Sequence, residues 1–261
     1  MGAWISKLFI EHADVFLKIM NQRWLWAKES AGGIVRILND FGILSGNLLD
    51  LCCGNGRISI CMALKGFKAV GVDISRPFIE DARRKAEEYG VSSLVRFVEG
   101  DVRRLKEVLK DAHESFDVVV NAWTSIGYFP PEEELEIFRQ ARELSKGNAV
   151  LFILETMHTD WLSLKFVPYG YFETDDILTL ESRKYDPTAS KLETTWTFYR
   201  KNGENLEFID RAEFELHVYS LQELSALLRR AGWEPVATYG NIATLQPMSP
   251  LTSLNLVARA K

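Results

Sequence analysis

Two spacings of apolar residues divide the first part of the chain. Between residues 48 and 154, short runs that are apolar throughout alternate with longer stretches in which apolar residues recur every three or four positions. The first spacing is typical of buried parallel strands, and the second is typical of helices that cover them. The pattern therefore predicts an α/β fold with a parallel sheet. The apolar runs are 48–53, 68–72, 94–98, 116–120 and 149–154.

The residues before the first run show helical spacing only. One pattern covers 8–29, and a second begins at Ile34 and ends at Gly42. Glycine is a common end of a helix because it adopts the left-handed conformation at little cost. We therefore expect residues 1–45 to form helices, with a break between the two patterns.

A third pattern begins after residue 156. Over 171–218, apolar and polar residues alternate, and turn signals such as Lys201-Asn202-Gly203-Glu204 separate the alternating stretches. This alternation predicts antiparallel strands. No linker flanks the stretch, and 261 residues fit one large domain with an insertion. We expect an inserted antiparallel β cap over 157–218.

The α/β pattern resumes after the predicted cap. Ser220 and Glu223 form a capping box at the start of a helix, and two apolar runs follow at 234–239 and 252–259. The chain is thus expected to hold three parts. These are N-terminal helices over 1–45, an α/β domain over 46–156 and 219–261, and the cap over 157–218.

Composition excludes several classes of protein. A formal net charge of −5 counts against tracking of a nucleic-acid backbone over a wide surface. No uninterrupted apolar stretch reaches the ~20 residues of a membrane span. Cys52, Cys53 and Cys61 are too clustered for a disulfide framework, and their odd number favours a reducing, cytoplasmic location. No two are spaced Cys-x-x-Cys and no histidine is near, so no metal site is expected.

Candidate chemistry concentrates after the first apolar run. Leu48-Leu-Asp-Leu-Cys-Cys-Gly-Asn-Gly-Arg57 runs from a strand into a Gly-x-Gly turn and then a helix. Glycine lets the backbone approach a ligand closely, and the following helix presents free N–H groups. A dinucleotide site usually has a third glycine, where this chain has Ser59. Asp50 would repel a pyrophosphate but suits a ligand with an ammonium group and no phosphate, such as S-adenosylmethionine.

An acidic residue follows each of the first three predicted strands. Asp73 ends the second strand and can bond both hydroxyls of a ribose. Asp101 follows the third strand, where an adenine amino group would lie. Together with Asp50, these acids are a more specific signal than a Gly-x-Gly turn alone.

The chain resembles the class I, Rossmann-like S-adenosylmethionine-dependent methyltransferases. The segments that carry the resemblance are LLDLCCGNGR, GVDIS, FVEGDVR and FDVVVNAWTSIGYF, in that order. Within the class it is similar to small-molecule enzymes that have a β-insertion after the fifth strand. The resemblance implies a seven-stranded sheet of order 3-2-1-4-5-7-6, N-terminal helices that cover the site, and S-adenosyl-L-methionine as cofactor.

The resemblance also implies roles for single residues. Asp73 would hold the ribose, Asp101 the adenine amino group, and Asn121 would lie below the reactive methyl. Arg57 would pair with a carboxylate. Cys52 has a second interpretation, as a small core residue. The full set of implied cofactor contacts is Asp50, Cys52, Gly54, Gly56, Arg57, Asp73, Ile74, Asp101, Val102 and Asn121.

Three polar residues are candidates for catalysis, namely Asn121, Tyr128 and His158. His158 follows the fifth strand, at the edge where open α/β sheets bind ligands. It is either a general base or a histidine that holds the cap in place. The aromatic residues of the cap build a substrate cavity, a core or a dimer interface. For a cavity, we expect a lining of Tyr128, Trp161, Tyr171 and Trp196.

The predicted function is methyl transfer to a nitrogen or oxygen of a small molecule. Methylation of RNA or protein, or a non-catalytic regulatory module that binds S-adenosylmethionine, are the alternatives. Asn121-Ala-Trp-Thr stands where base-amino methyltransferases have Asn-Pro-Pro-Tyr or Asp-Pro-Pro-Tyr, which disfavours nucleic acid. We expect no membrane partner, and either a monomer or a homodimer formed through the cap.

Overall fold

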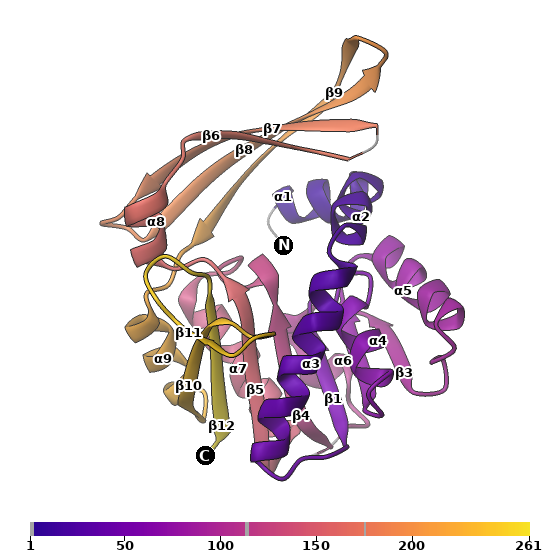
Figure 1. The fold of residues 1–261 in the computed structure, drawn as a ribbon, viewed down its shortest axis with the longest axis vertical. Coiled ribbons are helices and arrows are strands. Elements are labelled where there is room, and N and C mark those ends of the chain that lie inside the picture. Colours follow the sequence, from indigo (N-terminus) through magenta and orange to yellow (C-terminus); the bar gives the residue numbers. More distant parts are fainter. Residues whose placement is uncertain (1–2, 113–114, 175) are drawn as a thin grey trace.

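The computed structural model describes residues 3–112, 115–174 and 176–261, and it holds two sheets (Figure 1). The larger sheet has eight strands in the order β11-β10-β12-β5-β4-β1-β2-β3. Its strands are β1 (Asn47–Leu51), β2 (Lys68–Asp73), β3 (Val95–Glu99), β4 (Phe116–Ala122), β5 (Ser145–Thr156), β10 (Trp233–Asn241), β11 (Gln246–Pro247) and β12 (Leu254–Ala260).

The five strands from the first part of the chain are parallel, which confirms the predicted α/β class. β12 pairs with β5, and β10 pairs with β12, both antiparallel. The expected order of seven strands is therefore present. The structure adds an eighth strand that was not predicted. The eighth strand, β11, is a two-residue edge strand that pairs Pro247 with Tyr239 and Gln246 with Asn241. Proline is tolerated at a sheet edge, and a strand this short leaves no sequence period.

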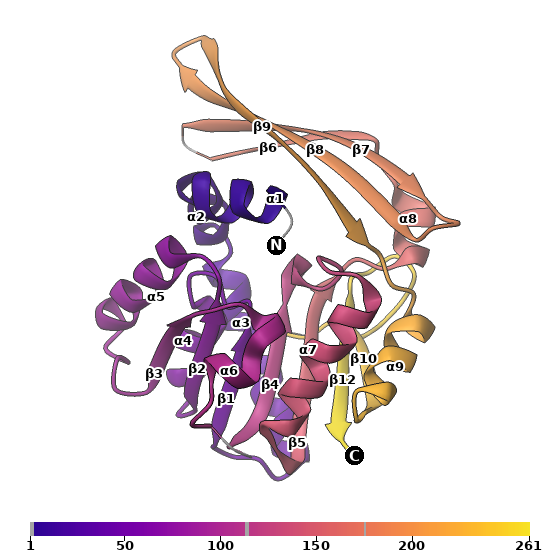
Figure 2. The ribbon, with the colours of Figure 1, turned by 180° about the vertical axis from the view of Figure 1, so that it is seen from behind.

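Helices cover both faces of this sheet (Figure 2). α3 (Trp24–Asp40) and α4 (Arg57–Ala63) pack on one face, and α6 (Leu105–Val108), α7 (Pro131–Glu143) and α9 (Leu221–Arg230) pack on the other. α5 (Arg76–Glu88) packs beside α4 and β3. Both faces of the strands are thus buried, as their apolar composition predicts.

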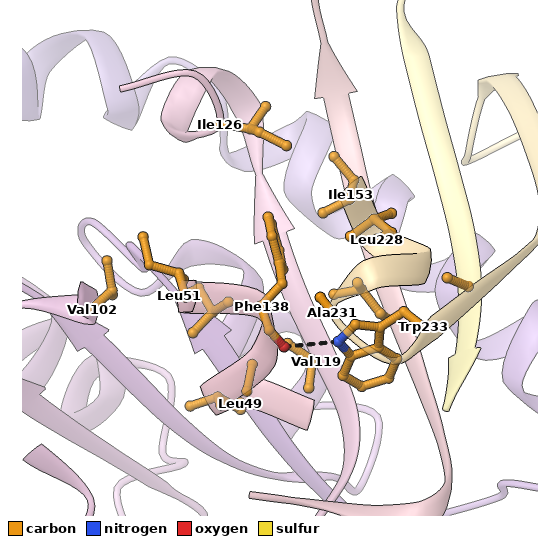
Figure 3. Packing of buried hydrophobic residues seen from close by; sticks show 14 of the residues in the cluster. Leu49, Leu51, Val102, Val119, Ile126, Phe138, Ile153, Leu228, Ala231 and Trp233 are labelled. Carbon is orange, nitrogen blue, oxygen red and sulfur yellow. Dashed lines mark hydrogen bonds between the residues drawn. The ribbon is translucent and has the colours of Figure 1, made fainter. Parts of the chain in front are cut away.

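The core on the α7 side is anchored by a buried tryptophan (Figure 3). The Trp233 indole N–H donates to the carbonyl oxygen of Phe138 at 2.9 Å. A buried indole needs such a partner. Leu228 and Ala231 belong to the same cluster, so the end of α9 and the start of β10 are fixed against α7.

The N-terminal helices differ from the predicted pattern. Helix α3 continues through the two glycines at 32 and 33, where a break was expected. A Cβ on Gly33 would lie 1.9 Å from the carbonyl oxygen of Ile242, so the glycine allows close packing and does not end the helix. The break comes earlier, at Gln22 and Arg23, after α1 (Ala3–Ser6), a π-helical stretch over Lys7–Glu11 and α2 (Ala13–Asn21).

The second sheet is antiparallel, in the order β6-β7-β8-β9. Its strands are β6 (Tyr169–Glu173), β7 (Ile177–Asp186), β8 (Lys191–Asn202) and β9 (Asn205–His217), and helix α8 (Thr159–Lys165) precedes them. The helix was not predicted. α1 and α2 lie between this sheet and the carboxyl edge of the larger one (Figure 1).

Apolar packing and ion pairs hold the N-terminal helices to the second sheet. Phe198 and Ala212 of the sheet belong to one buried cluster with Phe9 and Phe16. Asp210 accepts hydrogen bonds from Lys7 and from the His12 ring at 2.9 and 2.7 Å. The bounds of the three predicted parts of the chain stay predictions. In the described residues, no helix is long and apolar enough to cross a membrane, and all three cysteines are free.

Candidate active site

A cavity opens where the parallel strands of the larger sheet end. Its volume is about 680 Å³, including its opening to solvent. It is called the first cavity below. The loops after β1 to β4 contribute Cys52, Gly54, Arg57, Asp73, Ile74, residues 100–103, residues 122–125, Tyr128 and Phe129 to its lining. The N-terminal segment contributes Ile5, Phe9, Phe16 and Met20.

Backbone strain collects at this edge of the sheet. Three non-glycine residues have left-handed φ values here: Cys52 after β1 at 55°, Trp123 after β4 at 67° and Glu155 near the end of β5 at 53°. A bulky residue in this conformation costs of order 1–3 kcal/mol. Such strain persists where the surrounding structure enforces it, and it clusters at functional sites.

Asp73 lies on the wall of the first cavity at the end of β2. Its carboxylate accepts the N–H of Gly54 at 2.8 Å and the N–H of Ser75 at 2.9 Å. Burial raises the pKa of Asp73 to about 6, against the effect of these backbone bonds. The Asp73 carboxylate therefore fixes the Gly-x-Gly turn, and Asp73 also lines the first cavity.

Asp101 lines the same cavity but is held by an arginine. Its two oxygens accept hydrogen bonds from the Arg103 guanidinium at 2.7 to 3.1 Å. Burial acts to raise the pKa of Asp101, but the bonds from Arg103 outweigh it and lower the pKa. A ligand amino group at Asp101 would share the carboxylate with Arg103.

Three predicted cofactor contacts are absent from the described lining of the first cavity. Asp50 is buried in β1 and accepts a hydrogen bond from the Ser59 hydroxyl at 2.7 Å, and burial raises its pKa to about 6. A Cβ on Gly56 would lie 2.5 Å from the Phe97 ring, so this glycine serves packing. Asn121 is buried, and its Oδ1 has no hydrogen-bond partner in the described chain.

Arg57 is a buried cation for which the described residues provide no hydrogen-bond partner at Nε. It is 4% exposed. The guanidinium lies over the rings of Trp26 and Trp123, 5.9 and 5.4 Å from their centroids. Burial lowers the pKa of Arg57 to about 10, so the group stays positive at neutral pH. Arg23 stacks on the same two rings and pairs with Glu155.

A second cavity adjoins the first. Phe9, Phe16, Trp123, Thr124 and Tyr128 line both. The second cavity reaches about 1180 Å³ with its opening to solvent, and it lies between the N-terminal helices and the second sheet. Its sheet side is formed by Phe172, Glu181, Arg183, Leu192, Thr194, Trp196, Phe214 and Leu216.

Four aromatic residues were predicted to line an acceptor cavity, and the structure separates them into two pairs. Tyr128 and Trp196 line the second cavity, whereas Tyr171 and Trp161 are absent from its described lining. Tyr171 is 68% exposed because alternation along β6 directs it to the opposite face of the sheet. Trp161 lies on α8, beside a separate surface hollow.

The candidate catalytic residues Tyr128 and His158 lie in different places, since Tyr128 lines both cavities and His158 is absent from their described lining. The Tyr128 hydroxyl lies 3.1 Å from the Thr124 hydroxyl, and burial raises the pKa of Tyr128, so it is neutral near pH 7. His158 is fully buried at the start of α8. Its Nε2 donates to the carbonyl oxygen of Thr252 at 2.9 Å, and neither cavity includes it in its described lining. This position argues against the predicted role of His158 as a base.

Comparison with known proteins identifies the chemistry. Residues 48–148, which span β1 to β4 and the start of β5, match the family described as a methyltransferase domain. The chain is 25% identical over 192 residues to YqeM of Bacillus subtilis (strain 168), which carries a methyltransferase name, and the match covers 72% of this chain and 74% of YqeM. The matched part of this chain is a methyltransferase domain.

Solved structures share the fold of this methyltransferase. The CcbJ methyltransferase from Streptomyces caelestis superposes with a TM-score of 0.73 at 22% identity, over 90% of this chain and 89% of that one. CalS10, an amino pentose methyltransferase from Micromonospora echinaspora, gives 0.68 at 16% identity over 90% and 92%. CalS10 is described with S-adenosylmethionine bound, and this is the cofactor that the methyltransferase-domain match supports for this chain. In the described residues, no group of His, Cys, Asp or Glu could hold a metal ion.

Sequence reasoning missed several residues of the methyltransferase site. Met20 lies over the glycine turn, since a Cβ on Gly54 would be 2.7 Å from its sulfur. Trp123 lines both cavities and stacks on Arg23 and Arg57. Trp123 stands inside the segment that carries the resemblance, so its place after the fourth strand was a usable signal. Arg23 and Met20 come from the N-terminal helices, and nothing in their spacing marks them.

Proposed function

We propose that this methyltransferase transfers the methyl group to a nitrogen or oxygen of a small molecule held in the second cavity. The observation that carries the proposal is the shared wall of the two cavities, formed by Phe9, Phe16, Trp123, Thr124 and Tyr128. A cofactor in the first cavity and an acceptor in the second would meet at this wall.

The residues of the first cavity fit S-adenosylmethionine. Asp73 would accept the ribose hydroxyls, and Asp101 the adenine amino group, with Ile74 and the Val102 backbone beside the ring. Arg57, a buried cation with an unpartnered Nε, would receive the carboxylate of the methionine end near Gly54 and Cys52. Asp50 lies behind this wall, where its charge would favour the ammonium group. When bound, the cofactor supplies a methyl group activated by a positive sulfur.

The protein's own part in transfer would be positioning and exclusion of water. The apolar side chains shared by the cavities surround the transfer point, while Thr124 and Tyr128 offer hydroxyls that orient a nucleophile. Because Tyr128 is neutral, it can donate or accept a hydrogen bond there. Asn121, buried near the end of β4 with an Oδ1 that has no partner in the described residues, is the third polar group we place at this end of the site.

Small-molecule substrates are favoured by the enclosure of the second cavity and by the net charge of −5, which opposes phosphate tracking. CalS10 is named for an amino pentose, so an acceptor of that size suits this fold. We include in the proposal a cytoplasmic location and a monomer or a homodimer formed through the second sheet.

The test is turnover with a panel of small amines and alcohols, measured as release of S-adenosylhomocysteine. Asp73→Ala is the matched variant, expected to weaken S-adenosylhomocysteine by ~1.5–3 kcal/mol, the scale of hydrogen bonds to a charged group. Exposed Glu107→Gln is the control. Efficient methylation of bulk RNA, falling steeply with salt, would overturn the proposal. Tight cofactor binding without turnover of any acceptor would favour a regulatory module.

A further inference from the structure

Arg183 on β7 forms an ion pair with Glu181, but its side chain forms no hydrogen bond in the described part of the chain. It lines the second cavity, and its side chain is 21% exposed. Its Nε is buried without a partner, and no hydrogen bond of its guanidinium is found in the described part of the chain. The nearest carboxylate is Glu181, 3.6 Å from the guanidinium, which is too long for a hydrogen bond.

Glu181 balances the charge of Arg183 but does not bond its donors, since only the Oε2 atom of Glu181 faces Arg183, at 3.6 Å. The other carboxylate oxygen of Glu181 accepts the indole N–H of Trp196 at 2.8 Å. A guanidinium carries five donors in a planar fork that matches a carboxylate, and buried donors without partners cost free energy. The other arginine at the wall of this cavity, Arg23, is paired with Glu155. Arg183 is therefore the guanidinium that is left for a ligand.

Arg183 also marks one end of the second cavity. Of the residues that line the second cavity, Arg183 is the one that also lines a hollow beside α8 in the described residues. It is absent from the described lining of the first cavity. Trp123, Thr124 and Tyr128, which are shared with the first cavity, stand at the transfer end. An acceptor that reaches both ends has its nucleophile at one end and an anionic group at the other.

Resting on the proposed function, we propose that Arg183 binds a carboxylate of the methyl acceptor, and that the acceptor is an apolar or aromatic molecule with this carboxylate opposite its nucleophile. Phe172, Trp196 and Phe214 supply apolar walls between the ends. We commit to a carboxylate because one guanidinium neutralises its single charge, whereas a phosphate dianion would keep an uncompensated charge beside Glu181.

The experiment uses three probes that differ only at one end: 3-phenylpropionate, 3-phenylpropyl phosphate and 3-phenylpropanol. Their binding to the full chain is measured by calorimetry with S-adenosylhomocysteine present. We expect the carboxylate to bind about tenfold more tightly than the alcohol, the scale of one charge-assisted hydrogen bond. Arg183→Gln should remove this preference, and Arg183→Lys should keep part of it. Arg211→Gln, an exposed arginine of the same sheet that pairs with Glu213, is the control and should keep all of it.

Equal binding of the carboxylate and the alcohol, no measurable binding of any probe, or a preference that survives in Arg183→Gln would each overturn the proposal. Tighter binding of the phosphate would contradict the carboxylate and assign the subsite to phosphate. S-adenosylhomocysteine affinity and the melting temperature of each variant show whether it is folded. A failed methyl-transfer panel leaves the carboxylate preference measurable, so the two proposals fail separately.

Discussion

The two cavities are built in different ways. The first is formed mainly by backbone turns at the ends of parallel strands, and its polar groups, Asp73 and Asp101, lie within a few residues of those strand ends. The second is formed by side chains from α1, α2, the segment after β4 and the second sheet, which are far apart in sequence. With the proposed ligands assigned to them, the comparison teaches that local sequence features form the cofactor cavity, whereas long-range packing forms the acceptor cavity.

One loop belongs to both cavities, and Glu134 holds it. The Glu134 carboxyl is buried and accepts the N–H of Gly127 at 2.8 Å. The His217 N–H, at the end of β9, donates to the carbonyl oxygen of Gly127 at 2.9 Å. Tyr128, which follows Gly127 in this loop, is part of the shared wall. A disturbance of the loop is therefore expected to affect both cavities.

The largest predicted effect is on the pH dependence of stability. Burial raises the pKa of Glu134 to about 8, so the native state retains a proton that the unfolded state loses above about pH 4.5. The free energy of unfolding should therefore fall between about pH 4.5 and 8, by up to a few kcal/mol. Glu134→Gln, which keeps an acceptor for Gly127, should flatten this fall in urea unfolding at pH 5, 7 and 9. An unchanged pH slope in the variant would show that Glu134 is ionised in the native protein. Glu133→Gln, at an exposed neighbouring position, is the control.

The next effect separates cofactor binding from stability. Arg57→Met should weaken S-adenosylhomocysteine by about 10–100-fold, since the variant loses a charged hydrogen bond to the ligand. Its melting temperature should not fall, because a buried cation whose Nε has no hydrogen-bond partner in the described residues is replaced by an apolar side chain. Calorimetry and thermal unfolding check the two halves. Normal cofactor affinity with a lower melting temperature would assign Arg57 to the fold.

A smaller effect tests the second cavity alone. Trp196→Leu should raise the KM for a small-molecule acceptor by about tenfold through lost apolar contact. S-adenosylhomocysteine affinity should stay within twofold, since Trp196 is absent from the described lining of the first cavity. Tyr199→Leu, on the opposite face of β8, is the matched control. Equal losses of both ligands would mean that the cavities do not act separately.

The smallest effect on catalysis is expected for His158. Because its ring is buried against Thr252, His158→Gln should leave the pH profile of kcat unchanged and lower stability by about 1–3 kcal/mol, the cost of a disturbed buried hydrogen bond. A loss of ~10² or more in kcat at normal stability would restore the general base. Urea unfolding and initial rates from pH 6 to 9 decide between these outcomes.

The fold was predictable wherever one local signal dominates. Short apolar runs located the parallel strands, and alternation located the antiparallel sheet. Gly33 lies where the two predicted helical patterns meet, but its role is close approach to Ile242, a contact 209 positions away that no window includes. Two-residue β11 and the seven-residue helix α8 were too short to leave a period.

The candidate site was predictable to a similar extent. Acidic residues next to the strand ends were found, whereas several residues contributed by distant elements were not. Asp73 and Asp101 line the first cavity as their places after strands indicate. Tyr171 was expected in the acceptor cavity but lies on the other face of its strand, since aromatic content alone does not fix which face is buried. Arg183 escaped notice because an arginine in an alternating strand is ordinary until its missing partners are visible. These assignments to ligands stay predictions.

A crystal structure with S-adenosylhomocysteine bound tests the central claim most directly. We predict the ribose at Asp73, the adenine amino group at Asp101, the carboxylate at Arg57, and the sulfur facing the second cavity between Trp123 and Tyr128. A ligand sulfur that faces away from the second cavity, or a ligand that occupies the second cavity itself, would contradict the account.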